Sequence, residues 1–175
     1  DDAMEHAATF GKPKLVVTTV VSSSLLSRMA RDRGVACRET LTGFKWIADA
    51  ALRAEAEGEA FVCGYEEALG YTVGPLVRDK DGIGAALRMA ELVRFLKGRG
   101  QTVLGRLDEL LLAHGMSHQV QWSVTLPGAS GRGRIGAAMG ALRANPPDRI
   151  GQSLVVRTLD AERELETTKE GTRPS

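Results

Sequence analysis

Apolar residues occur in two different patterns along the first two thirds of the chain. Continuous β-branched runs such as Leu15–Val21 are typical of parallel strands buried on both faces. Between these runs, apolar residues recur at helical spacing up to a glycine that ends the helix. Strands are predicted at Leu15–Val21, Val35–Leu41 and Ala60–Gly64, and helices at Leu25–Gly34, Phe44–Glu57, Ile83–Lys97 and Val103–His114, with a glycine-punctuated loop at Gly70–Gly74. This order predicts an α/β domain, a mostly parallel sheet in a three-layer arrangement.

The pattern changes after Gly115. Val120–Leu126 alternates apolar and polar residues, which is typical of a strand with one face in water, and a helix at Ile135–Arg143 and a strand at Ser153–Leu159 follow. A strand–helix–strand piece of this size is too small to build its own core, so we expect a partial α+β domain. The expected organisation is a mobile arm or truncated helix at residues 1–13, the α/β domain at 14–115 and the partial domain at 116–175.

Composition narrows the function classes. The 175 residues carry 23 Lys and Arg against 22 Asp and Glu, so there is no basic excess for a phosphate backbone and no nucleic-acid partner is expected. The longest apolar runs are too short to span a bilayer, and no signal peptide follows the acidic start, so we expect no membrane partner. Cys37 and Cys63 are interpreted as reduced core thiols of a cytoplasmic protein. His114 and His118 are four residues apart, but Gly115 separates them, and no metal site is expected there.

Two strand ends carry polar residues that suit a ligand. Glu66 and Glu67 follow the buried run Ala60–Gly64, and carboxylates at such a position can accept hydrogen bonds from vicinal sugar hydroxyls. Thr42 and Gly43 follow another predicted strand, in a turn that offers backbone N–H groups beside a lysine. Each turn also has a plain structural interpretation, a solvated acidic turn in the first case and simple helix capping in the second.

A third charged turn, Arg78–Gly82, precedes the predicted apolar helix. Arg78 and Lys80 near a helix N-terminus suit an anionic ligand, and a lysine there can exchange a proton with it. The alternative is an ordinary charged helix entry with Asp81 as the N-cap residue. Because the carboxyl ends of parallel strands meet at one edge of a sheet, we expect the three turns to converge there.

A glycine motif in the last third of the chain offers a different function. Gly131, Gly133 and Gly136 match G-x-G-x-x-G after a predicted strand, and Asp160 lies where a ribose-binding acid would sit. The preceding strand is not a buried one and no further strand–helix units follow, so a flexible helix entry is the preferred interpretation. A small nucleotide-binding or regulatory α/β module that uses this loop stays open as the alternative function.

Three segments together resemble a known family. Thr40–Ile47, Gly64–Tyr71 and Val77–Ile83 resemble, in order and spacing, the third domain of the α-D-phosphohexomutases. The likeness is closest to the phosphoglucomutase and phosphopentomutase branch, which carries an alanine, here Ala68, after the two glutamates. It extends from about Leu15 to Leu112, and the stretch from 120 to 159 looks like the start of the family's fourth domain.

The resemblance implies an intramolecular phosphotransferase that interconverts sugar 1-phosphate and 6-phosphate through a bisphosphorylated sugar. It implies that Glu66 and Glu67 bind sugar hydroxyls in both orientations of the ligand. It also implies that the turn at Thr42 and Gly43 lies against the substrate. Where many relatives have a serine, this chain has Ala68, which removes one hydroxyl contact and leaves glucose, mannose and pentose phosphates all open as substrates.

The remaining roles implied by the resemblance concern charged residues. Lys80 is the expected catalytic proton carrier, and Arg78 and Lys45 are expected anion contacts. Near the end of the chain, Arg173 and Ser175 belong to a segment similar to the start of the family's phosphate-binding loop, which normally reads Arg-Pro-Ser-Gly-Thr. We expect these two residues to contact phosphate.

The resemblance also implies cofactors and partners that this sequence does not itself supply. Family members use Mg²⁺ and glucose 1,6-bisphosphate, but the sequence has neither a Thr-Ala-Ser-His serine loop nor an Asp-Gly-Asp-x-Asp metal loop. We therefore expect no metal-binding residue in this chain and interpret it as a fragment of a larger mutase, inactive by itself. Its expected partners are the phosphosugar and the rest of the mutase chain.

Overall fold

The structure is a computed structural model that describes residues 3–4, 11–120, 122–160, 165–168 and 171–174. They fall into two compact units, Asp1–Val120 and Gln121–Ser175, and each is described by itself. Most of the arm predicted at residues 1–13 lies outside the described residues, although Met4 is buried in the core. The assignment of the segments as domains stays a prediction.

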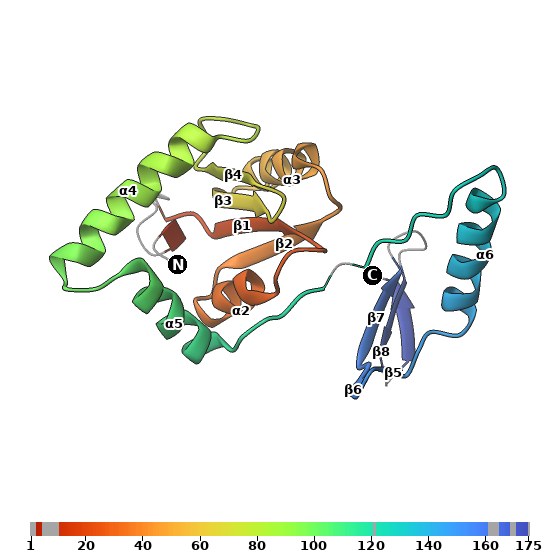
Figure 1. The fold of residues 1–175 in the computed structure, drawn as a ribbon. Coiled ribbons are helices and arrows are strands. Elements are labelled where there is room, and N and C mark those ends of the chain that lie inside the picture. The colour runs from red at the N-terminus through yellow and green to blue at the C-terminus, as the bar shows by residue number, and fades with distance from the viewer. Residues whose placement is uncertain (1–2, 5–10, 121, 161–164, 169–170, 175) are drawn as a thin grey trace. The chain divides into compact units, whose positions relative to one another are not determined.

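The first unit is a four-stranded sheet with helices on both faces (Figure 1). Its elements are β1 (Lys14–Thr19), α2 (Leu25–Asp32), β2 (Ala36–Thr40), α3 (Phe44–Ala56), β3 (Ala60–Glu66), β4 (Gly70–Val73), α4 (Gly82–Gly98) and α5 (Val103–His114). The strand order is β2-β1-β3-β4, with β1 parallel to both β2 and β3. The α/β class and the mostly parallel sheet are therefore confirmed.

The central strand explains the two-sided core. Successive side chains of a strand point to opposite faces, so Val16 packs with α2 while Leu15 and Val17 pack with α3. All three are fully buried, as expected for a parallel strand covered on both faces. In the register, Val16 lies beside Cys37 of β2 and beside Cys63 of β3.

The predicted loop Gly70–Gly74 is wrong, because Gly70–Val73 forms β4, antiparallel to β3. Tyr65 and Tyr71 stack across this hairpin with ring centroids 6.4 Å apart. Gly70 serves close packing: a Cβ there would lie 2.9 Å from an atom of the Phe44 ring. Gly70 is therefore required by the close approach of Phe44, and it does not indicate a loop.

Helix α4 has the predicted position but not the expected environment. Asp81 caps it by accepting a hydrogen bond from the Gly84 N–H at 2.8 Å. Leu96 is its one buried residue within the described chain, whereas Ile83 is 88% exposed and Leu87 61% exposed. The apolar composition of this helix therefore does not translate into burial in the described residues. None of the helices in the described part of the chain is long and apolar enough to cross a membrane.

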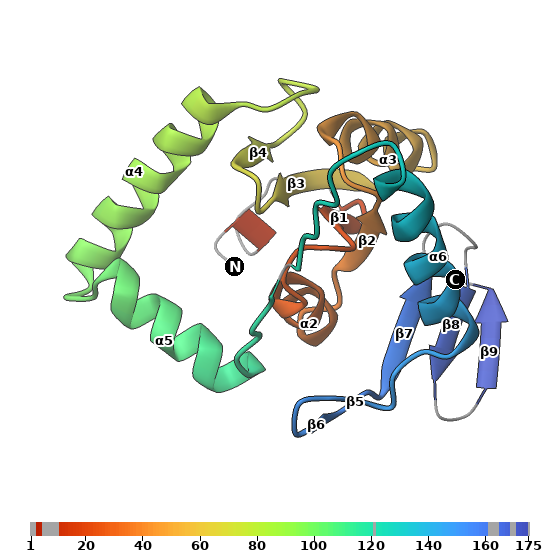
Figure 2. The ribbon, with the colours of Figure 1, turned by 45° about the vertical axis from the view of Figure 1, so that its right-hand side comes forward.

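The described residues of the second unit form one helix and short antiparallel strands, among them β7, β8 and β9 side by side (Figure 2). Its elements are α6 (Gly131–Ala144), β5 (Arg149–Ile150), β6 (Ser153–Leu154), β7 (Arg157–Asp160), β8 (Leu165–Thr168) and β9 (Gly171–Pro174). The strand predicted at Val120–Leu126 is wrong: its described residues have no regular structure and Trp122 is 89% exposed. Alternation alone does not make a strand without a partner strand beside it. The strand predicted at Ser153–Leu159 is divided between β6 and β7.

The glycine motif does not form a loop, so both the preferred interpretation as a flexible helix entry and the nucleotide-binding alternative are wrong. Gly131 is the first residue of α6, and Gly133 and Gly136 lie inside the helix. No described strand leads directly into it. Asp160 is instead engaged by Arg143, with Nε and Oδ2 3.0 Å apart. The backbone arrangement that lets a dinucleotide loop receive a pyrophosphate is therefore missing here.

Candidate functional site

Glu66, in one of the three predicted turns, contacts the other two at the carboxyl edge of the sheet. Glu66 is the last residue of β3 and is only 6% exposed. Its Oε1 accepts a hydrogen bond from the Gly43 N–H at 2.5 Å, and its Oε2 lies 3.4 Å from Lys80 Nζ. One carboxylate thus joins the turn after β2 to the turn before α4. Because β2 and β3 both pair in parallel with β1, the carboxyl end of β2 and the carboxyl end of β3 lie at the same edge of the sheet, as the sequence predicts.

The Gly43 turn has its shape because glycine occupies the position with positive φ. Gly43 has φ +117°, in the region that residues with a Cβ rarely adopt, and it is the N-cap residue of α3. Phe44 and Ile47, both buried, then hold the first turns of α3 against the sheet. Gly64 makes this packing possible, since a Cβ there would lie 2.6 Å from Ile47 Cγ2.

Glu67 reaches the opposite side of the sheet edge. This exposed residue accepts a hydrogen bond from the Ser23 N–H through Oε1 at 2.7 Å. Ser23 lies in the turn between β1 and α2, so the two adjacent glutamates contact the entries of two different helices. Sequence reasoning missed Ser23 as part of this site, because a backbone N–H contact has no residue-type signature. The position of Ser23 shortly after the buried strand Lys14–Thr19 is the sequence signal that places it at the carboxyl edge of the sheet.

Arg78 is not brought together with these residues. Its guanidinium makes two hydrogen bonds to the Glu55 carboxylate, at 3.1 and 2.6 Å. Glu55 is twelve residues after Gly43, and at 1.5 Å per helical residue it lies about 18 Å farther along α3. Arg78 therefore fastens the chain to the far end of α3, and the structure offers no support for it as an anion contact beside Glu66.

The other predicted site residues lie in three different settings. Thr42 and Lys45 flank the Gly43 turn and are exposed, with Lys45 Nζ 5.0 Å from the centroid of the Trp46 ring. Arg173 belongs to β9 of the second unit. Ser175 lies outside the described residues. The expectation that Arg173 and Ser175 contact phosphate therefore stays a prediction.

The charged groups at the sheet edge define what the site can bind. A carboxylate has about four acceptor positions and an ammonium has three donors. The contacts of Glu67 and Lys80 with protein groups use only part of that capacity, and the Lys80 side chain is 48% exposed. Hydroxyl groups suit the acceptors and an anionic group suits the ammonium, so the arrangement favours a polyhydroxylated anion.

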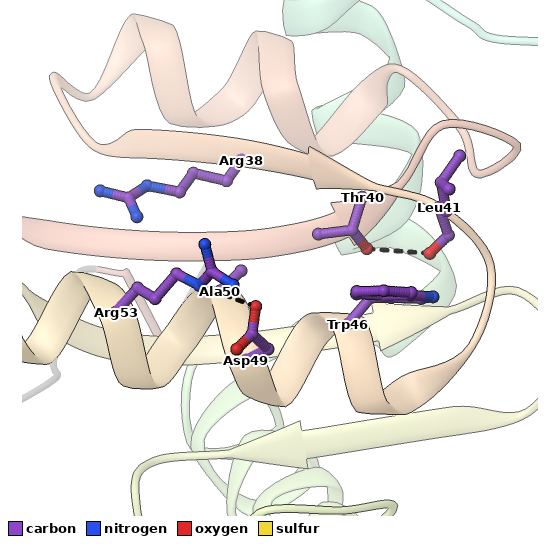
Figure 3. Close-up of a pocket in the computed structure, with 7 residues that line it drawn as sticks. All are labelled: Arg38, Thr40, Leu41, Trp46, Asp49, Ala50 and Arg53. Carbon is purple, nitrogen blue, oxygen red and sulfur yellow. Dashed lines mark hydrogen bonds and ion pairs between the residues drawn. The ribbon is translucent and has the colours of Figure 1, made fainter. Parts of the chain in front are cut away.

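A pocket of about 320 Å³ lies elsewhere, between β2 and α3 (Figure 3). It is lined by Arg38, Thr40, Leu41, Trp46, Asp49, Ala50 and Arg53. Its charged groups already have protein partners: Arg53 Nε is 2.9 Å from Asp49 Oδ2, and Arg38 pairs with Glu57 and Glu59. None of the predicted site residues lines this pocket, although its Leu41 and Trp46 adjoin the Gly43 turn, where a Cβ on Gly43 would lie 3.5 Å from Trp46 Cδ1.

The described residues do not fit a resident divalent cation. No group of three or more His, Cys, Asp or Glu side chains among them is arranged to hold a metal ion. Nor do the thiols supply a ready nucleophile, because burial raises the pKa of Cys37 to about 11 and also raises the pKa of Cys63. The chemistry of the described residues therefore rests on their carboxylates, their ammonium groups and the backbone N–H groups at the sheet edge.

Comparison with known proteins agrees with the resemblance noted in the motifs. The family model described as phosphoglucomutase/phosphomannomutase, alpha/beta/alpha domain III, matches residues 2–112. A "probable phosphomannomutase" of Haemophilus influenzae is 38% identical over 151 residues, which is 86% of this chain and 29% of the relative. A phosphoglucomutase of Staphylococcus aureus is 33% identical over 147 residues, or 84% of this chain and 26% of the relative.

A further curated relative and a solved structure are also similar to this chain. A "probable phosphoribomutase" of Schizosaccharomyces pombe is 39% identical over 100 residues, covering 57% of this chain and 17% of the relative. A crystal structure described as "putative phosphomannomutase" from Thermus thermophilus superposes with a TM-score of 0.51 at 24% identity, covering 61% of this chain and 23% of that one, and this likeness concerns the fold alone. The chain spans less than a third of the length of these curated relatives. By its sequence and its α/β fold, the chain belongs to the phosphoglucomutase/phosphomannomutase family.

Proposed function

We propose that this chain is the phosphosugar-binding part of a phosphohexomutase, an enzyme that interconverts sugar 1-phosphate and 6-phosphate. The observation that carries the proposal is the convergence on Glu66, which joins the Gly43 turn and Lys80 at the carboxyl edge of the sheet. Ligands of open α/β sheets bind at this edge. The names of the relatives, mutases of glucose, mannose and ribose phosphates, support the same class of substrate.

In this proposal the two glutamates have different tasks. Glu67 is exposed and offers its remaining acceptor positions to sugar hydroxyls, whose hydrogen bonds to a carboxylate are charge-assisted. Glu66 is buried, and it chiefly orients the Gly43 turn and the Lys80 ammonium. Thr42 adds a hydroxyl beside the same turn. The pair thus combines one ligand-facing carboxylate with one that holds the site together.

Lys80 is the proposed catalytic residue. Phosphoryl transfer removes a proton from the attacking sugar hydroxyl while negative charge stays on the phosphoryl oxygens. A half-exposed ammonium fixed near Glu66 can attract the phosphate, give a proton to the leaving oxygen and take in its place the proton that the attacking hydroxyl loses. Lys45, in the first turn of α3, is a further cation beside the Gly43 turn.

The rest of the reaction requires groups from outside this chain. Family members use a phosphoserine as phosphoryl donor, Mg²⁺ as an electrophile for the transferred group, and glucose 1,6-bisphosphate as the bisphosphorylated sugar. This chain offers no residues for the first two, so we propose that it is inactive by itself and acts with the rest of a mutase chain. Glucose 1,6-bisphosphate is then the ligand that this chain binds through its hydroxyls and one phosphate.

The proposal is tested by titrating glucose 1,6-bisphosphate into the 175-residue chain while backbone amide shifts are recorded by NMR. Saturable shifts are expected at Gly43 and Ser23, the two amides that Glu66 and Glu67 contact. Glu67→Gln should weaken binding by about 1–3 kcal/mol, the range for a charge-assisted hydrogen bond. Arg78→Ala is the matched control, because it removes a charge that lies far from the site.

Either of two results would overturn the proposal. Shifts confined to the second unit, or an equal loss of affinity in Glu67→Gln and Arg78→Ala, would place the ligand elsewhere. Comparison of glucose 1-phosphate, mannose 1-phosphate and ribose 1-phosphate in the same titration then ranks the sugars.

A further inference from the structure

One residue of the candidate site has an unusual backbone conformation. Residues 67–69 form the loop between Glu66 and Gly70, the last pair of the β3–β4 hairpin. Leu69, at the end of this loop, has φ +57°, and it is the one non-glycine residue with positive φ among those that the structure describes. Three-residue hairpin loops commonly end in this left-handed conformation, and glycine or asparagine usually occupies the position.

Leucine gains nothing at this position from the fold itself. Its Cβ disfavours the left-handed region, so a glycine or an asparagine would relax the backbone. Its side chain is 83% exposed, so burial in the described protein does not offset that strain. Neither local conformation nor packing therefore accounts for a leucine here, and strained residues of this kind cluster at ligand-binding sites.

The neighbours of Leu69 are the groups that the proposed function uses. Glu67, two residues earlier, is the ligand-facing carboxylate, and Gly70 follows directly. A Cβ on Gly70 would lie 2.9 Å from Lys80 Cε, so the Lys80 side chain lies against the residue next to Leu69. An exposed apolar side chain thus stands at the end of a loop that begins with Glu67 and ends beside Lys80.

We propose that Leu69 is a specificity-determining residue that contacts the apolar C–H face of the sugar ring held by Glu67 and Lys80. This inference rests on the proposed function and adds to it. Glu67 can accept hydrogen bonds from the sugar hydroxyls, and Lys80 can pair with the phosphate. A pyranose or furanose ring also has aliphatic C–H groups, and an apolar side chain is needed to remove these from water. Fixing the backbone of Leu69 before the ligand arrives reduces the ordering cost of that contact.

The test compares Leu69→Asn, Leu69→Gly and Leu69→Met in the 175-residue chain, with thermal melting and with binding of glucose 1-phosphate and inorganic phosphate. Asn and Gly relax the left-handed backbone, so these variants should melt at or above the wild-type temperature. They should nevertheless bind glucose 1-phosphate about tenfold more weakly, as expected for losing much of a buried leucine contact. Their affinity for inorganic phosphate, which has no C–H face, should not change. Leu69→Met should retain sugar binding because it keeps an apolar side chain.

The outcomes separate this inference from the proposed function. If Glu67→Gln weakens sugar binding while Leu69→Asn and Leu69→Gly bind like the wild type, the role of Leu69 is refuted and the site stands. If the affinities for sugar phosphate and inorganic phosphate fall together, Leu69 is not a specificity residue. If the wild-type chain binds no sugar phosphate, both the function and the role of Leu69 are refuted.

Discussion

Replacing Glu66 by glutamine changes a single buried charge at the point where two turns meet. The Gly43 N–H then donates to a neutral amide oxygen, and the other end of the side chain presents an NH₂ group to the Lys80 ammonium. Hydrogen bonds to charged groups contribute about 1.5–3 kcal/mol against about 0.5–1.5 for neutral ones, a difference of about 1 kcal/mol. The Lys80 pair adds about 0–1 kcal/mol, because that side chain is half exposed and water screens it.

We therefore expect Glu66→Gln to lower the free energy of unfolding by about 1–2 kcal/mol. Glu66→Ala should cost more, because it also leaves the Gly43 N–H without its acceptor, a penalty of about 1–3 kcal/mol. Urea denaturation followed by far-UV circular dichroism measures both values, and an unchanged slope against urea shows that the folded state is the same. Glu67→Gln is the matched control and should cost less, since Glu67 is exposed.

A double-mutant cycle of Glu66→Gln with Lys80→Met isolates the ion pair. We expect a coupling free energy of about 1 kcal/mol or less, with most of the Glu66 effect independent of Lys80. If Glu66→Gln unfolds at the same urea concentration as the wild type, the carboxylate does not hold the Gly43 turn. The burial of Glu66 would then contribute nothing to the stability of that turn.

Other contacts in the first unit can be tested in the same way. Gly64→Ala should destabilise the first unit by about 1–3 kcal/mol through overpacking against Ile47, detectable as a lower Tm, and an unchanged Tm would show that β3 and α3 separate easily. Arg78→Ala should lower stability by about 1 kcal/mol or less, as partly exposed ion pairs do, and should leave phosphosugar affinity unchanged in a binding titration. The hydrogen bond from His114 lowers the pKa of Asp32, so the stability it contributes is present above the unfolded pKa of about 3.9 and is lost as the pH falls toward the lower folded pKa. Asp32→Asn should therefore show a smaller drop in Tm between about pH 5 and pH 3 than the wild type, and parallel profiles would contradict the assignment.

The central elements of the first unit are predictable because several local signals agree. The β-branched run at β1, the helical spacing of α3 and the glycine stop at Gly58 all indicate the observed elements. The meeting of the Gly43 turn with Glu66 is also predictable, since it follows from parallel strand order alone. Strand β4 is not, because Gly70 is required by a contact with Phe44 that no local pattern reveals.

The partners of individual charges could not be predicted from the sequence. Arg78 has the composition of a ligand contact, but Glu55, twenty-three residues earlier, takes its guanidinium. Glu66 and Glu67 are adjacent and chemically identical, and yet one is buried and the other exposed, because the strand ends between them. The side-chain period of a strand together with the position of its last residue decides which acid faces the ligand.

The register of the central strand has a consequence for the redox behaviour of the protein. Val16 lies between Cys37 on one side and Cys63 on the other, so the two cysteines are separated by a whole intervening strand. Two inter-strand spacings of about 4.8 Å place their Cα atoms about 10 Å apart, beyond the roughly 7 Å that a disulfide can bridge. The sheet therefore cannot be locked or strained by an internal cystine, and an oxidising environment should not join its two sulfur atoms to each other.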